Sequence, residues 1–156
     1  MCSSDLSAFP SPEDLSQRVK DAAIACGFDA VGVAPAVAGL GAERLADWLR
    51  EGKQGEMTYM ALRREARENP QRVLEGVRSV VVCAMQYRTE EPAAPTAGRG
   101  RISRYAWGRD YHDVLHEAFQ RLGEAVEAIL PAVRWRGVVD SAPLMDKAWA
   151  EEAGLG

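Results

Sequence analysis

The chain has 156 residues, of which 47% are hydrophobic and 27% charged, and a formal net charge of −4. This length and composition indicate one globular domain and exclude the disordered and fibrous classes. The negative balance excludes a basic surface over the whole molecule, so any contact with phosphate groups must be local. We assign residues 1–14 to a Ser/Pro-rich leader and residues 15–156 to the domain.

No targeting or membrane-spanning segment is recognisable in the sequence. The leader has neither the basic nor the apolar region of a secretory signal. The longest apolar stretch, residues 80–85, is far shorter than the roughly 20 residues that a membrane span needs. We therefore expect a cytoplasmic protein without membrane contact.

The first predicted helix begins at the end of the leader. Ser11 is a suitable N-cap, Pro12 suits the first helical position, and Gly27 suits the end of the helix. Apolar residues recur on one face of this segment, as in an amphipathic helix. A short buried strand is predicted to follow over residues 28–36.

The middle of the chain contains the clearest strand. Residues 42–70 are predicted to form two short helices that are separated by glycines and end before Pro70. Residues 79–87 form a nearly continuous apolar run rich in β-branched residues, which indicates a strand buried on both faces. Residues 88–100 are rich in Pro, Gly and Ala and are predicted to form an exposed loop.

The last third predicts a long helix, a strand and a short helix. Helical periodicity extends from Asp110 to Leu130, a strand is expected over residues 134–140, and a final helix over residues 143–153. Helices that alternate with short buried strands indicate an α/β fold with a small mixed sheet flanked by helices. Because the sequence stops just beyond a helix, we expect it to be part of a longer protein.

Asp140 has two interpretations. It lies where the predicted strand ends and the next helix opens, and ligands gather at such strand ends in α/β folds. Asp140 or Ser141 could cap the helix, which contributes ~1 kcal/mol. Alternatively, Asp140 is a general acid, which requires burial to raise its pKa, whereas the helix dipole would lower it.

The segment that precedes the long helix is rich in arginine and aromatic residues. Arginines offer forked charged donors, and aromatic rings offer flat apolar faces, so the segment could hold an anion or a nucleotide. It lacks the G-x-G-x-x-G spacing and does not directly follow a strand, which disfavours a Rossmann or P-loop site. The alternative is a solvated loop whose aromatic side chains cover the core. These residues are Arg99, Arg101, Arg104, Tyr105, Trp107, Arg109 and Tyr111.

We expect no metal site in these residues. His112 and His116 have metal-binding spacing, but Asp113 replaces the glutamate of the H-E-x-x-H motif. The cysteines fit neither a disulfide framework nor zinc or iron–sulfur spacing. They are Cys2, Cys26 and Cys83. We expect the last two to be small core residues.

Five stretches of the sequence, in this order, resemble the N-terminal domain of epoxyqueuosine reductase. They are "GEMTYM", "RENP", "SVVVCAMQY", "ISRYAWGRDYH" and "VDSAPLMDKAWAEEAGLG". The resemblance covers most of the chain from about residue 15, and the last two stretches together are its specific part. It implies a bacterial enzyme that reduces epoxyqueuosine at the wobble position of tRNA to queuosine, the last step of queuosine biosynthesis.

The resemblance also implies cofactors and site residues. The family uses cobalamin and two four-iron four-sulfur clusters, in a nitroreductase-like core similar to that of reductive dehalogenases. By this resemblance Asp140 is the proton donor beside cobalamin, and Arg67 and Ser103 contact the cobalamin, with Arg104 and Tyr105 as neighbours. Arg67 lies in a run of mixed charges, which otherwise indicates a solvated helical face.

The chain departs from the family pattern at its end. Family members continue with a segment that completes the cobalamin pocket and with two cysteine-rich ferredoxin motifs, which are missing here. We therefore expect the isolated chain to be inactive and to need an external or downstream electron donor, and we expect a monomer. The alternatives are a non-catalytic corrinoid-binding or interaction module, and another member of the cobalamin-dependent reductive dehalogenase superfamily.

Overall fold

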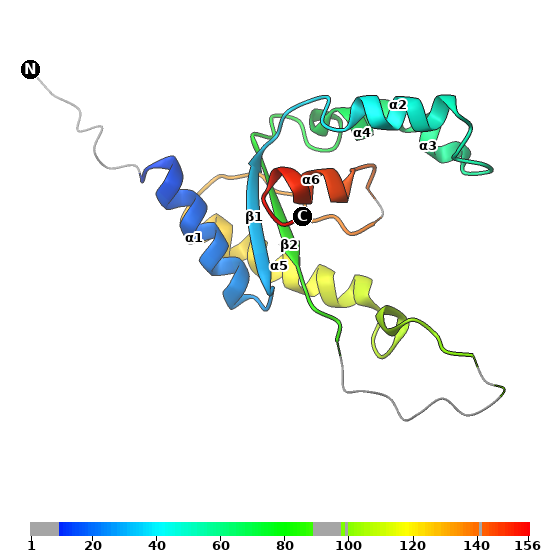
Figure 1. Ribbon diagram of the computed structural model, residues 1–156. Helices are drawn as coiled ribbons and strands as arrows, with labels where there is room; N and C mark the ends of the chain where they lie inside the picture. The colour runs from blue at the N-terminus through cyan, green and yellow to red at the C-terminus, as the bar shows by residue number, and fades with distance from the viewer. Residues whose placement is uncertain (1–9, 89–97, 99, 141) are drawn as a thin grey trace, which may run out of the picture.

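The computed structural model describes residues 10–88, 98, 100–140 and 142–156 (Figure 1). Most of the predicted leader and most of the predicted 88–100 loop lie outside the described residues. The elements are α1 (Pro12–Ala25), β1 (Ala30–Pro35), α2 (Ala42–Arg50), α3 (Thr58–Leu62), α4 (Arg64–Glu68), η2 (Pro70–Arg72), β2 (Ser79–Ala84), η3 (Arg104–Ala106), α5 (Tyr111–Ile129) and α6 (Asp146–Glu152). Within the described part, no helix is both long and apolar enough to cross a membrane.

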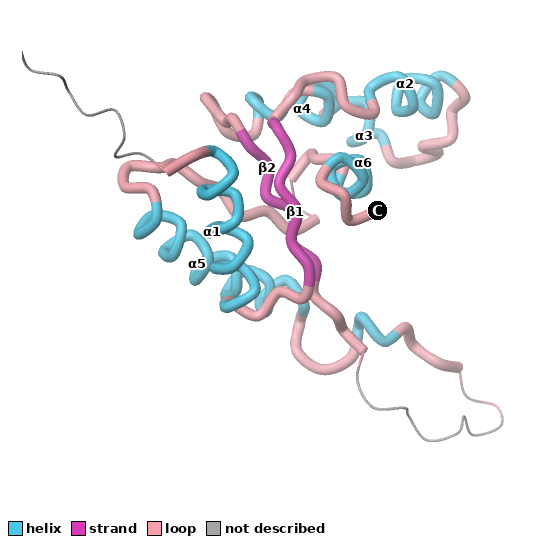
Figure 2. The backbone as a smooth tube through the Cα atoms, turned by 60° about the vertical axis from the view of Figure 1, so that its left-hand side comes forward, coloured by secondary structure: helices cyan, strands magenta, loops and turns pink. Residues whose placement is uncertain are grey.

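The two clearest predicted strands pair with each other. β1 and β2 form an antiparallel ladder in which Ala30 faces Ala84 and Pro35 faces Ser79. Helices α1 and α5 lie on one side of this ladder and α6 on the other, which gives three layers (Figure 2). Gly32 lets α6 approach closely, because a Cβ there would lie 2.3 Å from the carbonyl oxygen of Ala153. The α/β class with a small sheet is therefore confirmed, and the described sheet is antiparallel rather than mixed.

The first helix forms as its sequence predicts. The Ser11 hydroxyl accepts a hydrogen bond from the backbone N–H of Asp14 at 3.1 Å, and Pro12 opens the helix. The helix ends before Gly27, whose φ of +101° suits glycine. Because α1 begins at Pro12, the predicted domain boundary at residue 14 falls inside it.

The core lies between α1, α5 and the sheet. Ala23, Phe28, Ala118 and Leu122 form a buried cluster, and the rings of Phe28 and Phe119 are 5.2 Å apart. Dispersion and burial of these side chains hold α5 against α1 and against the sheet. The N-terminal end of α5 extends beyond the ladder, towards η3 (Figure 1).

The predicted strand over residues 134–140 is wrong, because this segment is irregular. Its side chains fix it to other segments. Arg134 donates to the carbonyl of Glu75 at 2.7 Å, and Arg136 donates to the carbonyl of Val73 at 2.9 Å. These bonds tether the segment to the turn before β2 rather than to the edge of the ladder.

Three other predicted boundaries also differ. The second predicted short helix is interrupted at Arg63 (φ −106°, ψ 21°), which separates α3 from α4. The strand predicted over residues 79–87 ends at Ala84. The final helix begins at Asp146, because the N–H of Leu144 bonds to the carbonyl of Ala142 in a tight turn.

Candidate functional site

Asp140 lies in the loop between α5 and α6. Its backbone has a φ of +49°, a conformation that non-glycine residues seldom adopt and that Asp tolerates better than most. α6 begins at Asp146 with Met145 as its N-cap, so the capping interpretation of Asp140 is wrong. The Asp140 side chain is 58% exposed, so the described residues do not by themselves supply the burial that a general acid requires.

The first turn of α5 holds the Asp140 side chain. The Tyr111 hydroxyl donates a hydrogen bond to Asp140 Oδ2, and His112 Nε2 lies 4.0 Å from the same oxygen. The Tyr111 and His112 rings stack with centroids 4.1 Å apart, and Tyr105 of η3 packs edge-on to Tyr111 at 6.1 Å. Three aromatic rings thus form one wall beside the carboxylate.

Hydrogen bonds shift the pKa values of Tyr111 and Asp110 beside Asp140. The bond to Asp140, followed by burial and by the charge of Asp140, raises the pKa of Tyr111 to about 12, so Tyr111 remains a neutral donor. The backbone N–H of His112, and then its side chain, lower the pKa of Asp110, which is therefore an anion. Asp110 Oδ1 lies 2.8 Å from His112 Nδ1. Because a carboxylate only accepts, this contact assigns the proton to Nδ1 and leaves Nε2 facing Asp140.

Arg67 reaches the same region through Asp146. Burial, and then the negative charge of Asp140, raise the pKa of Asp146, whereas the guanidinium of Arg67 lowers it. The Nε of Arg67 is buried and has no hydrogen-bond partner in the described part of the chain. Such an orphan donor indicates an acceptor that these residues do not provide. The neighbouring Arg64–Glu68 pair, at 2.6 Å, forms the solvated face that the mixed charges predict.

The loop with the remaining predicted cofactor ligands ends at this wall. Ser103 is the N-cap of η3, is exposed, and makes no capping hydrogen bond with its side chain. Arg104 borders a hollow of about 370 Å³ beside the end of β2. The exposed apolar side chains of Ile102 and Tyr105 are 72% and 55% accessible. Trp107 fixes the loop by donating to the carbonyl of Ile102 at 3.0 Å.

The structure therefore links some of the predicted site residues to Asp140 through an intervening side chain and places the others in the adjacent loop. Tyr105 reaches Asp140 through Tyr111, and Arg67 reaches it through Asp146, whereas Ser103 and Arg104 belong to the same loop as Tyr105. Sequence reasoning named Tyr111 and His112 in other roles and did not connect them with Asp140, and it missed Asp110 and Asp146 as members of this group. The sequence signal for these residues is the polar run at the start of α5. The hydrogen bond from Tyr111 to Asp140 joins residues far apart in the chain, so no local pattern predicts it.

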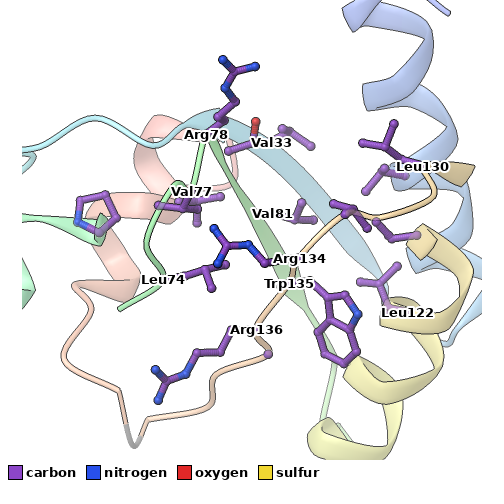
Figure 3. A pocket seen from close by; sticks show the side chains of 18 of the residues that line it. Val33, Leu74, Val77, Arg78, Val81, Leu122, Leu130, Arg134, Trp135 and Arg136 are labelled. Carbon is purple, nitrogen blue, oxygen red and sulfur yellow. The ribbon is translucent and has the colours of Figure 1, made fainter. Parts of the chain in front are cut away.

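A larger cavity lies elsewhere in the molecule. It has a volume of about 600 Å³ and is bounded by the sheet, α5 and the irregular 134–138 segment (Figure 3). Val33, Val81 and Leu122 give it apolar walls, and Trp135 lies against α5. Its lining does not include Asp140, Arg67 or Ser103, so we place the candidate site at Asp140, where the polar groups converge. Among the described residues, no group of three or more His, Cys, Asp or Glu side chains could hold a metal ion.

Comparison with known proteins gives a consistent result. The family model described as epoxyqueuosine reductase QueG, DUF1730, matches residues 67–141. The epoxyqueuosine reductase of Gloeobacter violaceus is 48% identical over 141 residues, which cover 89% of this chain and 43% of that protein. The chain thus spans less than half the length of the curated relatives it matches.

Solved structures share the fold. A crystal structure of epoxyqueuosine reductase with a tRNA-Tyr epoxyqueuosine-modified tRNA stem loop matches with a TM-score of 0.78 at 28% identity, covering 92% of this chain and 39% of that one. A Bacillus subtilis epoxyqueuosine reductase, described as having a catalytic aspartate loop swung out of its active site, matches with a TM-score of 0.75 at 27% identity over 92% of this chain and 39% of that one. Together these matches show that the chain belongs to the epoxyqueuosine reductase family.

Proposed function

We propose that this chain forms the Asp140-bearing part of an enzyme that reduces epoxyqueuosine in tRNA to queuosine, the last step of queuosine biosynthesis. The observation that carries the proposal is the carboxylate of Asp140, held by Tyr111 at the wall of aromatic rings. A solved relative that contains an epoxyqueuosine-modified tRNA stem loop supports tRNA as the substrate. The net charge of −4 implies that the tRNA contacts are local.

The reaction explains why an acid is needed. Converting an epoxide to an alkene and water consumes two electrons and two protons. The oxygen leaves poorly as an alkoxide, so a proton must reach it from a positioned acid. Asp140 is a group in this site that can carry that proton, and the Tyr111 hydroxyl fixes its carboxylate.

The exposure of Asp140 fits a loop that functions when it is covered. The Bacillus subtilis relative is described with its catalytic aspartate loop swung out, which supports mobility of the corresponding region. We propose that substrate and cofactor cover Asp140 in the working enzyme. This covering desolvates the carboxyl and favours its protonated form.

Cobalamin is the cofactor implied by the resemblance, and the described residues suit it. The buried, unpartnered Nε of Arg67 offers a donor, and the Ser103 hydroxyl is not used for capping. Tyr105 provides exposed apolar cover, and Arg104 lies beside it as a further polar group. Such a mixture of flat apolar surface and scattered polar groups suits a large ring with amide side chains. When bound, cobalamin would supply the reducing electrons.

The electrons must reach the site from outside these residues. The sequence has three cysteines, too few to ligate two four-iron four-sulfur clusters. We propose that the clusters belong to the remainder of a longer protein, and that the complete domain has the nitroreductase-like core of reductive dehalogenases. The small sheet flanked by helices supports this assignment.

The test is complementation of a bacterium that lacks its own epoxyqueuosine reductase. The full native protein that carries this sequence and the 156-residue chain alone are expressed separately. We expect mass spectrometry of tRNA nucleosides to find queuosine with the full protein and epoxyqueuosine with the chain alone. Accumulation of epoxyqueuosine with the full protein, beside a relative that complements, would refute the proposed activity.

One observation favours a second candidate, a corrinoid-binding module without chemistry. Asp140 is more exposed than a working acid should be. Titration of the full native protein with cob(II)alamin, followed by its visible spectrum, measures binding separately from turnover. Binding without formation of queuosine would select the module, and binding with turnover would select the enzyme.

A further inference from the structure

The reduction consumes two protons, whereas one carboxyl group carries one. A source of protons for Asp140 is therefore needed in each cycle. This inference rests on the proposed function and concerns the residues around Asp140 that could supply it. His112 is a nearby group that can both accept and donate a proton, and its Nε2 lies 4.0 Å from Asp140 Oδ2.

Asp110 fixes the direction of the His112 ring. Asp110 Oδ1 accepts from the backbone N–H of His112 at 2.9 Å and lies 2.8 Å from Nδ1 of the same residue. Stacking on Tyr111 limits rotation of the ring. With Nδ1 engaged, the other nitrogen, Nε2, points to Asp140 Oδ2 at 4.0 Å.

The 4.0 Å between His112 Nε2 and Asp140 Oδ2 suits a hydrogen bond that forms only at intervals. It exceeds an ordinary hydrogen bond by about 1 Å, a gap that a small side-chain rotation closes, and catalytic bonds are often long before the substrate binds. The charged and titratable groups around the ring are Asp110 and Asp113 at the start of α5, Tyr111 stacked on it, Asp140 across from it, and His116 one turn further along.

The ring is also open to solvent. The His112 side chain is 41% exposed, so water can deliver a proton to it while its other face lies on Tyr111. Tyr111 cannot serve this purpose, because its high pKa keeps it a weak acid. The path thus runs from solvent to His112 and from His112 to Asp140.

We propose that His112, oriented by Asp110, returns protons to Asp140 between proton-donating steps. Asp140 gives its proton to the substrate oxygen and becomes a carboxylate. Protonated His112 then releases the proton on Nε2, which bonds to Asp140 Oδ2, and the ring remains neutral with its proton on Nδ1. A buffer acid or hydronium ion reprotonates Nε2, and no electron moves in this step. His112 acts through Asp140 and does not itself touch the substrate.

The experiment measures epoxyqueuosine turnover by the full native protein and three variants. His112→Ala removes the ring, His112→Gln keeps a polar side chain that cannot carry the proton, and His116→Ala is the matched control on the same helix. We expect His112→Ala and His112→Gln to lose about 100-fold in turnover, the lower range for general acid–base catalysis. Added imidazole should restore His112→Ala in proportion to its concentration and leave His116→Ala unchanged.

Several results would overturn the inference. Wild-type turnover by His112→Gln would show that the side chain only positions its neighbours, and failure of imidazole to restore His112→Ala would exclude proton return. A second measurement does not depend on activity. In the full native protein labelled with ¹⁵N-histidine, neutral His112 should carry its proton on Nδ1, and a proton on Nε2 would overturn the proposal. Inactive wild-type protein with the expected Nδ1 proton would refute the proposed function while supporting the ring orientation.

Discussion

Gly123→Ala should destabilise the protein, although alanine normally favours a helix. Gly123 is buried within α5, and a Cβ there would lie 1.9 Å from Cζ2 of Trp135. Ordinary contacts to a Cβ are 3.4–4 Å, so the indole must move by more than 1 Å. That movement would break the hydrogen bond from Trp135 Nε1 to Glu127 Oε1, which is 2.7 Å long.

The two opposing effects set the size of the change. Replacing glycine by alanine in a helix stabilises it by ~1 kcal/mol. Overpacking costs ~1–3 kcal/mol, and the displaced ring and lost bond place this site at the upper end. The net loss is therefore about 2 kcal/mol, which lowers Tm by roughly 4–8 °C in a domain of this size.

The assay is urea unfolding, followed by circular dichroism, of the wild type, Gly123→Ala, Trp135→Ala and the double variant. In the Trp135→Ala background the clash is absent, so Gly123→Ala should become stabilising. The difference between the two backgrounds measures the Gly123–Trp135 coupling directly. Stabilisation by Gly123→Ala in the wild-type background would refute the close packing of Trp135 on α5.

Three further predictions follow from local contacts. Ser11→Ala removes the N-cap of α1 and should cost about 1 kcal/mol of unfolding free energy, measured by urea titration; an unchanged midpoint would contradict the cap. Since the folded pKa of Tyr111 is raised from 10.0 to about 12, its stabilising effect is present below pH 10 and is lost as the pH rises towards 12. Absorbance titration should show one late-ionising tyrosine, and Asp140→Asn should bring its ionisation back towards pH 10. A late ionisation that persists in Asp140→Asn would be inconsistent with the hydrogen bond. Burial, and then the nearby Cys26, raise the pKa of the half-buried Cys83 to about 12, so this thiol should resist iodoacetamide at pH 8 until urea is added; rapid labelling of Cys83 itself in the native protein, located by peptide mass spectrometry, would contradict the raised pKa.

The elements with local signals could be predicted from the sequence. Ser11 and Gly27 mark the two ends of α1, and Asp110 marks the start of α5 through its cap. The β-branched run of β2 indicates a strand without any knowledge of its partner. These features depend on neighbouring residues, so single-chain patterns reveal them.

The 134–140 segment shows why the rest could not be predicted. Its apolar end resembles a buried strand, but its arginines bind carbonyl groups of residues 73–75. Gly123 accommodates its tryptophan, a contact that no local pattern indicates. Packing against distant segments thus overrides strand propensity here.

In the candidate site, too, one part is predictable from the sequence and the other requires the tertiary fold. The place of Asp140 in the chain and the family resemblance are enough to predict it as a site residue. Its links to Tyr111 and His112 join residues that are separated by a whole helix, and the link to Arg67 passes through Asp146. These links require the tertiary fold, so the sequence alone could not supply them.

The role of Asp140 as the proton donor is tested by nucleoside analysis of tRNA after reaction with the Asp140→Asn variant. The variant is made in the full native protein. Asp113→Asn is the control, because it alters an exposed carboxylate in the first turn of α5, the turn that contacts Asp140. We expect Asp140→Asn to bind cobalamin but to leave epoxyqueuosine unreduced, whereas Asp113→Asn forms queuosine. Formation of queuosine by Asp140→Asn at the wild-type rate would contradict the assignment of Asp140 as the proton donor.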